Sequence, residues 1–345
     1  MKRTIFLGAV TLALSTAMTV PTYAADDLAA MYKGRNITIV FGYGVGGTYG
    51  KTSIVLSRHI GKFIPGNPNV ITQSMPGAGG LKSANYAYNV MPKAGFNFLM
   101  PPDMSMVSQL LRPTKVKYDA KNFTWLGRVF GSNNLLAIRR DAGISSIEEA
   151  KKKIGLMAST GKGSPTFIVT ALVNGLVGTK FKIVEGYKGS HRTKLSVEQG
   201  ETQGISLAWA SWKSDRASWF TGGDKSYLIP LVQSGFEREP DLQNVPLIQD
   251  LVSDPNAKSA ADLIATSSLF GRGLALPPGV PNKLVEPLRE AFWKTVQSPA
   301  FLAEVKRTKL DYSPLKGAEI QKTVNKVLNM SPKAVALARK AIFGK

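Results

Sequence analysis

The chain has 345 residues, and its 44 Lys and Arg against 23 Asp and Glu give a formal net charge of +21. It contains no cysteine, which excludes disulfide bonds, thiolate metal sites and cysteine nucleophiles. The positive charge favours acidic small molecules or anionic surfaces as partners, whereas scattered basic residues without interleaved aromatic residues make nucleic acid an unexpected one.

The first 24 residues have the pattern of a secretory signal peptide. Residues 1–3 are a short basic head, residues 5–20 are apolar with few interruptions, and Thr22 and Ala24 are small residues where a signal peptidase reads the chain. The apolar run is shorter than the roughly 20 residues that span a bilayer. We therefore expect export and cleavage near Ala24.

Strand and helix patterns alternate in the next part of the chain. Residues 36–41 (NITIVF) and 69–73 are rich in β-branched residues, and apolar residues recur at helical spacing over 51–64 and 81–90. Glycine-rich loops follow both strands, FGYGVGGTYG over 41–50 and MPGAGG over 75–80. This order predicts parallel strands with helices on both faces and a ligand site at the carboxyl ends of the strands.

A second unit of the same kind begins near residue 154. A strand over 154–158 precedes the loop STGKGSPT and a helix over 167–177, and a strand over 181–185 precedes GYKGS. Further strands are expected at 96–100, 125–130, 135–138, 204–207 and 227–233, and further helices at 28–33, 145–153, 283–297 and 320–342. We expect an α/β fold with a discontinuous first lobe (25–130 and 232–345) and a second lobe (131–231), and the strand at 227–233 is a candidate for returning the chain to the first lobe.

The first glycine-rich loop is typical of an anion site, because glycine lets backbone N–H groups approach a ligand and a helix N-terminus attracts negative charge. It fails the dinucleotide fingerprint, since the third glycine comes one residue early and Phe63 and Ile64 stand where an acid is needed. It fails the P-loop spacing, since Val45 stands five residues before Gly50. We expect neither nucleotide nor any other cofactor.

Groups for catalysis are few. The chain has two histidines, His59 and His191, neither with a carboxylate nearby in sequence, and no metal-ligand spacing occurs. Ser164 lacks the second glycine of a nucleophile elbow. Two alternatives to a binding protein remain open: an exported enzyme that acts on an acidic metabolite with Ser164 and a histidine base, and a basic envelope protein that binds anionic surfaces.

Three tryptophans, Trp209, Trp212 and Trp219, fall at spacings of three and seven residues, which place them on one face of a helix. Such a stripe is more often core than ligand wall. The segment nevertheless follows a strand directly, where a loop of the cleft would begin. Both interpretations stay open for Trp209 and Trp212.

The order FGYGVGGTYG, MPGAGG, STGKGSPT, GYKGS and LPPGVP before a helix resembles the substrate-binding proteins of tripartite tricarboxylate transporters, the TctC or Bug receptor family. The resemblance covers nearly all of the chain after residue 24. It implies a monomeric periplasmic binding protein of type II, two lobes that close on a small carboxylic acid, and delivery of that acid to the permease subunits of the transporter. It implies neither an enzyme nor a metal site.

The resemblance also implies ligand-binding residues in both loops. The first loop contributes Gly46, Gly47, Thr48 and Tyr49, the second contributes Ser159, Thr160, Gly163, Ser164 and Thr166, and we add Tyr187, Trp209 and Trp212 as candidates. Backbone amides and hydroxyls suffice in this scheme, without a buried arginine. The family carries an aspartate where this chain has Gly50, so we expect an unusual choice of ligand.

Overall fold

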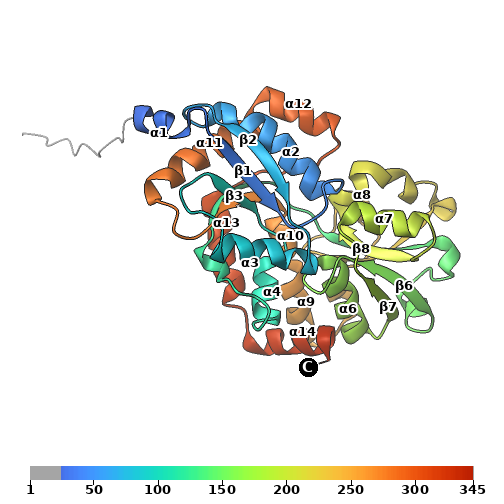
Figure 1. Cartoon of the computed structure of the whole chain (residues 1–345). Coiled ribbons are helices and arrows are strands. Elements are labelled where there is room, and N and C mark those ends of the chain that lie inside the picture. The colour runs from blue at the N-terminus through green and yellow to red at the C-terminus, as the bar shows by residue number, and fades with distance from the viewer. Residues whose placement is uncertain (1–24, 345) are drawn as a thin grey trace, which may run out of the picture.

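Two β-sheets organise residues 25–344, the part of the chain that this computed structural model describes (Figure 1). The first sheet, which defines the first lobe, has the order β11-β4-β10-β3-β1-β2, and the second sheet, which defines the second lobe, has the order β7-β6-β8-β5-β9. The strands are β1 Asn36–Phe41, β2 Asn69–Ser74, β3 Asn97–Met100, β4 Thr124–Phe130, β5 Asn134–Arg139, β6 Ile154–Ser159, β7 Lys180–Glu185, β8 Gly204–Ala208, β9 Leu228–Ser234, β10 Arg272–Leu276 and β11 Leu315–Lys316.

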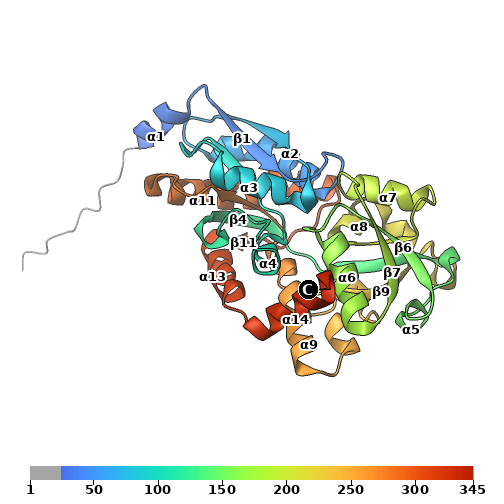
Figure 2. The same cartoon turned by 60° about the horizontal axis from the view of Figure 1, so that its bottom comes forward.

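Helices cover both faces of each sheet, with short 3₁₀ turns between them (Figures 1 and 2). The α-helices are α1 Ala25–Tyr32, α2 Thr48–Ile60, α3 Leu81–Asn89, α4 Ser105–Leu111, α5 Ile147–Ala150, α6 Pro165–Val177, α7 Ser190–Glu198, α8 Trp209–Arg216, α9 Pro255–Ala265, α10 Ser267–Phe270, α11 Val285–Gln297, α12 Pro299–Arg307, α13 Gly317–Leu328 and α14 Pro332–Phe343. The expected α/β fold with two lobes is confirmed.

Parallel pairing in each lobe confirms the expected βαβα units. In the first sheet β1 pairs in parallel with β2 and β3, and in the second β6 pairs in parallel with β7 and β8. The strand β10 enters the first sheet antiparallel, between β3 and β4. The strand expected at 227–233 is β9, which pairs antiparallel with β5 in the second sheet, and the next strand, β10, lies in the first sheet.

The core of the first lobe explains why α2 lies where it does. Ile37 and Ile39 of β1 are fully buried and pack in one cluster with Leu56 and Ile60 of α2. Full burial of each such side chain stabilises the fold by roughly 1.5–3 kcal/mol. Truncation of Leu56 to alanine would cost about 2–5 kcal/mol through the cavity it leaves. This packing aims the N-terminus of α2 at the second lobe.

The C-terminal part differs from the sequence expectation. The stretch 320–342 is divided into α13 and α14, because Pro332 begins a new helix and lacks the backbone N–H that a continuous helix needs. The helix expected at 145–153 shortens to α5. Helices α9 and α14 pack against α6 of the second lobe, and α14 also contacts α4 of the first. Figure 2 shows α14 between the two lobes.

The predicted signal peptide, residues 1–24, lies outside the described residues. Among residues 25–344, none of the helices combines the length and the apolar character that crossing a bilayer requires.

Candidate ligand-binding cleft

A small cavity of about 30 Å³ lies between the two lobes. Its walls come from the loops that the sequence singled out and from several segments that it did not. First-lobe residues of the wall are Tyr43, Gly47, Thr48, Tyr49, Asp103 and Arg272, and second-lobe residues are Asn134, Thr160, Ser164, Pro165, Thr166, Ser190, Leu207, Ala208 and Ser211. A single water needs roughly 10–15 Å³ of such space, so a ligand of several carbon atoms enters only if the lobes separate.

Glycines bring the two lobes into direct backbone contact. Gly44 N–H donates to the Lys188 carbonyl at 2.7 Å across the cleft. A Cβ atom on Gly47 would lie 2.5 Å from Ser190 Oγ, and one on Gly79 would lie 2.5 Å from the backbone nitrogen of Ser164. Because a real Cβ essentially never approaches so closely, Gly79 admits no larger side chain in the closed arrangement, whereas a side chain at Gly47 would require the Ser190 hydroxyl to move.

Four helices begin at the cavity wall. The first turns of α2 and α6 face it from opposite lobes, and α7 and α8 begin beside it at Ser190 and next to Ala208. Gly47 and Ser164 are the N-cap residues of α2 and α6, and neither caps its helix through a side-chain hydrogen bond. Unsatisfied N–H groups and the helix dipole at such ends attract anions.

Hydroxyl groups form a buried cluster at the start of α6. Thr166 Oγ1 lies 2.5 Å from Ser164 Oγ and 3.2 Å from Ser159 Oγ, and it accepts from the Thr160 N–H at 2.9 Å. Ser164 Oγ also donates to the Gly161 carbonyl at 2.9 Å. These bonds fix the loop over 159–166 and orient its remaining donors toward the cavity.

A buried ion pair forms part of the first-lobe wall. Arg272 Nη1 donates to Asp103 Oδ2 at 3.1 Å, and Arg272 Nη2 donates to Thr48 Oγ1 at 3.3 Å. The guanidinium carbon lies 3.9 Å from the ring centroid of Tyr49, whose hydroxyl accepts from the Asp103 N–H at 2.8 Å. Asp103 and Arg272 are only 4% and 5% exposed, so the surrounding protein, and not solvent, must compensate their charges.

Burial and pairing act in opposite directions on the pKa values of this pair. Burial raises the pKa of Asp103, and Arg272 opposes that rise through its charge and its hydrogen bond. Burial acts to lower the pKa of Arg272, but Tyr49 and Asp103 raise it, and the net direction is upward. Burial also raises the pKa of Tyr49. At neutral pH the wall therefore carries a permanent guanidinium beside neutral phenols.

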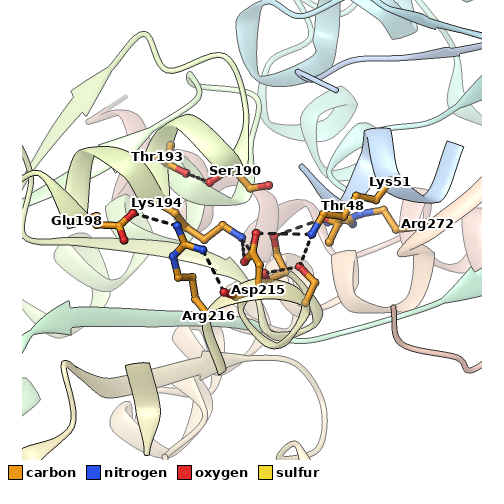
Figure 3. A network of polar contacts seen from close by, with 11 residues as sticks. Thr48, Lys51, Ser190, Thr193, Lys194, Glu198, Asp215, Arg216 and Arg272 are labelled. Carbon is orange, nitrogen blue, oxygen red and sulfur yellow. Dashed lines mark hydrogen bonds and ion pairs between the residues drawn. The ribbon is translucent and has the colours of Figure 1, made fainter. Parts of the chain in front are cut away.

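A second polar network joins the lobes next to the cavity (Figure 3). Lys194 of α7 is paired with Asp215 of α8 and donates to the Ser211 carbonyl at 3.0 Å. Lys51 of α2 reaches the same Asp215 from the first lobe at 3.6 Å, and Thr48 Oγ1 donates to Ser211 Oγ at 3.4 Å. Burial lowers the pKa of Lys194 to about 8, against the opposing effect of Asp215.

The structure brings half of the predicted site residues to one cavity. Gly47, Thr48, Tyr49, Thr160, Ser164 and Thr166 line it. The other predicted residues lie behind or beside the wall. Gly46 packs near the ring of His191, Gly163 lies against Ala78 and Leu81, and Ser159 is fully buried in the hydroxyl cluster.

Three aromatic candidates, Tyr187, Trp209 and Trp212, lie apart from the cavity wall. Trp209 and Trp212 are buried in the core cluster of the second lobe, where each ring contacts Phe220 edge to face. Trp212 Nε1 donates to the Leu135 carbonyl at 3.5 Å, and Trp209 Nε1 to Asp241 Oδ2 at 3.3 Å. Tyr187 lines a neighbouring pocket with Thr160, and its hydroxyl lies 3.1 Å from Glu201.

Gly50 marks a tight loop and not merely a missing carboxylate. A Cβ atom there would lie 2.0 Å from the Val45 carbonyl oxygen. The backbone of the first loop folds back onto the first turn of α2 at this point. An aspartate at this position would therefore require a different path of the loop.

Sequence reasoning missed Asp103, Arg272 and Asn134. Because β10 runs antiparallel to β3, its first residue, Arg272, lies at the carboxyl end of β3, which Asp103 follows after two prolines. Asn134 begins β5 and pairs with Ala208 at the carboxyl end of β8. The sequence led us to expect a site without a buried arginine, but the buried Arg272 lines the cavity. An arginine and an aspartate separated by 169 positions leave no local pattern.

The two histidines serve other contacts. His59 Nε2 lies 2.6 Å from Glu304 Oε2 of α12, and His191 lies on α7 against Gly46. Neither is among the residues that line the cavity. Within residues 25–344 there is also no group of three or more His, Cys, Asp or Glu residues placed to hold a metal ion.

Comparison with known proteins agrees with this geometry. No protein-family model matches the chain. A Cupriavidus necator protein described as "UPF0065 protein in gbd 5'region" is 24% identical over 322 residues, which cover 91% of this chain and 90% of that protein. Among solved structures, the periplasmic binding protein BugD has a TM-score of 0.68 at 17% identity and covers 90% of this chain and 98% of its own.

Two further structures carry bound acids. A protein of R. palustris solved with adipate has a TM-score of 0.65 at 19% identity and covers 88% of this chain and 97% of its own. MatC from Rhodopseudomonas palustris with bound malate has a TM-score of 0.66 at 15% identity and covers 88% of this chain and 99% of its own. The resemblance to the TctC and Bug solute-binding proteins is thereby confirmed, and the chain has the two-lobed fold of that family.

Proposed function

We propose that the protein is a periplasmic solute-binding protein that captures a small carboxylic acid between its lobes. The observation that carries this proposal is the meeting of two helix N-termini, those of α2 and α6, at one cavity from opposite lobes, next to the guanidinium of Arg272. One anionic group at this point contacts both lobes at once. Binding therefore favours the closed arrangement.

The available donors are sufficient for useful affinity. Hydrogen bonds to a charged group contribute roughly 1.5–3 kcal/mol each, and each helix N-terminus adds about 0.3–2 kcal/mol. After the cost of ordering and closure, a surplus near 8 kcal/mol corresponds to a Kd of about 1 μM. The hydroxyls of Thr48, Ser164 and Thr166 donate to other groups of the protein and thereby hold both loops in place before the ligand arrives, which reduces the ordering cost.

The comparisons support a carboxylate as the ligand class. Two proteins with the same fold were solved with adipate and malate, which are dicarboxylic acids. The signal-peptide pattern of residues 1–24 supports export to the periplasm, and the motif order supports delivery to the permease subunits of a tripartite tricarboxylate transporter. In this scheme the permease recognises the closed shape of a single protein chain.

The rival function, an exported enzyme with Ser164 as nucleophile, has less support. A general base has to lie within hydrogen-bond reach of the reacting proton, at roughly 2.6–3.2 Å or through one water. The partners of Ser164 Oγ are the Gly161 carbonyl and Thr166 Oγ1, which are not bases at neutral pH. Lys194, whose pKa is lowered to about 8, is instead engaged with Asp215 and the Ser211 carbonyl.

A thermal-shift screen of the purified protein tests the proposal. We expect at least one mono- or dicarboxylate from a broad panel to raise the Tm, and we expect the matching uncharged amide to have no effect. Thr48→Val and Ser164→Ala should reduce the shift, because each removes a hydroxyl of the cavity wall, whereas Ser259→Ala, which removes a partly exposed hydroxyl of α9, should not. A panel without any shift would remove the support for a carboxylate receptor.

A further inference from the structure

We propose that Asp103 and Asn134, together with Arg272, form a subsite for a hydroxyl group next to the ligand's carboxylate, so that the protein selects 2-hydroxy acids. This inference rests on the proposed function and specifies its substrate class. In this proposal Asp103 and Asn134 distinguish acids that have the same carbon skeleton but different substituents. The N-termini of α2 and α6 bind the carboxylate that all these acids share.

The first observation is a set of buried polar atoms without partners. Asp103 Oδ1, Asn134 Oδ1 and Arg272 Nε are each buried and make no hydrogen bond of ordinary geometry with the described residues. All three residues line the same cavity. An unsatisfied buried polar atom costs roughly 1–3 kcal/mol, more if it is charged. The three residues that carry these two acceptors and one donor thus lie together in the wall of the proposed ligand site.

The second observation is that the other polar atoms of these residues already have partners. Asp103 Oδ2 is engaged by Arg272 Nη1 at 3.1 Å, and Asn134 Nδ2 donates to Ser267 Oγ at 3.2 Å. Arg272 Nη2 donates to Thr48 Oγ1 at 3.3 Å. These bonds hold the three side chains in place from behind. The free atoms, two acceptor oxygens and one donor nitrogen, are the ones left for a ligand.

The chemistry of the free atoms distinguishes the substituents of an acid. A parent acid with a plain methylene at carbon 2 offers no donor to the two acceptor oxygens. Its carboxylate is itself an acceptor and cannot satisfy them. An ammonium group would donate to them, but it would add a positive charge beside the buried guanidinium of Arg272 and near four helix N-termini. A hydroxyl donates to Asp103 or Asn134 and accepts from Arg272 Nε without adding charge. The geometry therefore matches a hydroxyl.

Calorimetric titrations with matched acids test this inference. Each series keeps one carbon skeleton and varies the substituent at carbon 2 among hydrogen, hydroxyl and ammonium. The three series are propionate, lactate and alanine; succinate, malate and aspartate; and glutarate, 2-hydroxyglutarate and glutamate, with both enantiomers of each chiral acid. In every series that binds, we expect one hydroxy acid to bind at least tenfold more tightly than both other members, since a hydrogen bond to a charged group is at stake.

Variants then assign the preference to the two residues. Asn134→Leu removes one acceptor without touching the ion pair, and it should reduce the preference for the hydroxy acid over the parent acid at least threefold. Asp103→Leu with Arg272→Met removes the ion pair as a unit and avoids an unpaired buried charge. This double variant should abolish the preference. Ser108→Ala removes a buried unpaired hydroxyl that does not line the cavity and should leave the preference unchanged.

The outcomes separate the two levels of the proposal. Equal affinity for parent and hydroxy acids, or tighter binding of the amino acid, would overturn the hydroxyl subsite and leave carboxylate binding standing. A preference that survives in Asn134→Leu and in the double variant, with both shown to be folded by circular dichroism, would overturn the assignment to these residues. Failure of every carboxylate to bind would overturn the proposed function and the subsite with it.

Discussion

Lys51 Nζ on α2 lies 3.6 Å from Asp215 Oδ2 on α8, so a cation of the first lobe faces an anion of the second beside the cleft. Asp215 is also paired with Lys194 of its own lobe. Opening of the cleft separates Asp215 from Lys51 but not from Lys194. The contact between Lys51 and Asp215 therefore stabilises the closed arrangement alone.

Lys51→Met should weaken ligand binding by up to about fivefold, because a partly exposed ion pair contributes roughly 0.2–1 kcal/mol. The loss should shrink as salt screens the pair. Titration calorimetry at low and high ionic strength measures both effects. Lys62→Met, an exposed lysine of the 3₁₀ turn after α2, is the matched control. An equal loss in the control would assign the effect to net charge instead of the contact.

Lys194 should make the stability of the protein depend on pH. Burial lowers its pKa to about 8 from an ordinary value of 10.5, so between these values the unfolded chain binds more protons at this site than the folded chain does. The free energy of unfolding therefore rises with pH over this window, by up to about 3 kcal/mol from this group. Below pH 8 the cost of charging a buried lysine is fully present.

Urea denaturation of wild type and Lys194→Met across pH 7–10.5 measures this effect as a difference, which removes the contributions of other lysines and tyrosines. We expect the stability of wild type relative to the variant to increase with pH. A difference that stays constant over the window would mean that the ammonium of Lys194 is solvated or fully compensated by Asp215.

The buried pair of Asp103 and Arg272 should show strong coupling in unfolding experiments. Arg272→Met leaves a buried carboxylate without its partner, and Asp103→Leu leaves a buried guanidinium, so each should cost about 3–5 kcal/mol. The double variant should recover most of that loss. Chemical denaturation of the wild type, the two single variants and the double variant gives the coupling energy. Additive losses would show that the two charges are compensated independently.

Gly50 should tolerate neither alanine nor aspartate. Both substitutions introduce the same Cβ, which would lie 2.0 Å from the Val45 carbonyl oxygen, so both should cost about 2 kcal/mol or more and by similar amounts. Thermal or urea unfolding measures the loss. A stable Gly50→Asp variant that binds acids with altered preference would instead indicate that the loop readily adopts the path implied for relatives with the acid.

Local patterns predicted the strands and the loops of both lobes well. The strand β1 has the boundaries that its buried, β-branched run predicted. The helix predicted over 167–177 is longer only by Pro165 and Thr166 at its start. Both loops reach the cavity because parallel strands end at one edge of a sheet. The pairing of β9 with β5 depended on tertiary packing, whereas the break at Pro332 has a local cause that the expected helix over 320–342 overlooked.

The charged half of the candidate site was beyond reach of local patterns. Arg272 is a single arginine at the start of an apolar strand, and Asp103 follows two prolines in a loop. Only the antiparallel insertion of β10 beside β3 brings them together. The spacing of the tryptophans likewise could not show whether Trp209 and Trp212 belong to the core or to the ligand site. A local pattern gives the apolar face of a helix but not what that face packs against.

Titration calorimetry of the purified protein with a panel of small carboxylic acids tests the central claim most directly. We expect one acid molecule to bind per protein with a Kd of about 1 μM, and we expect a loss of affinity in Thr48→Val and Ser164→Ala, whose hydroxyls line the cavity from opposite lobes. Absence of binding for every acid, or binding that both substitutions leave unchanged, would contradict a carboxylate site between the lobes.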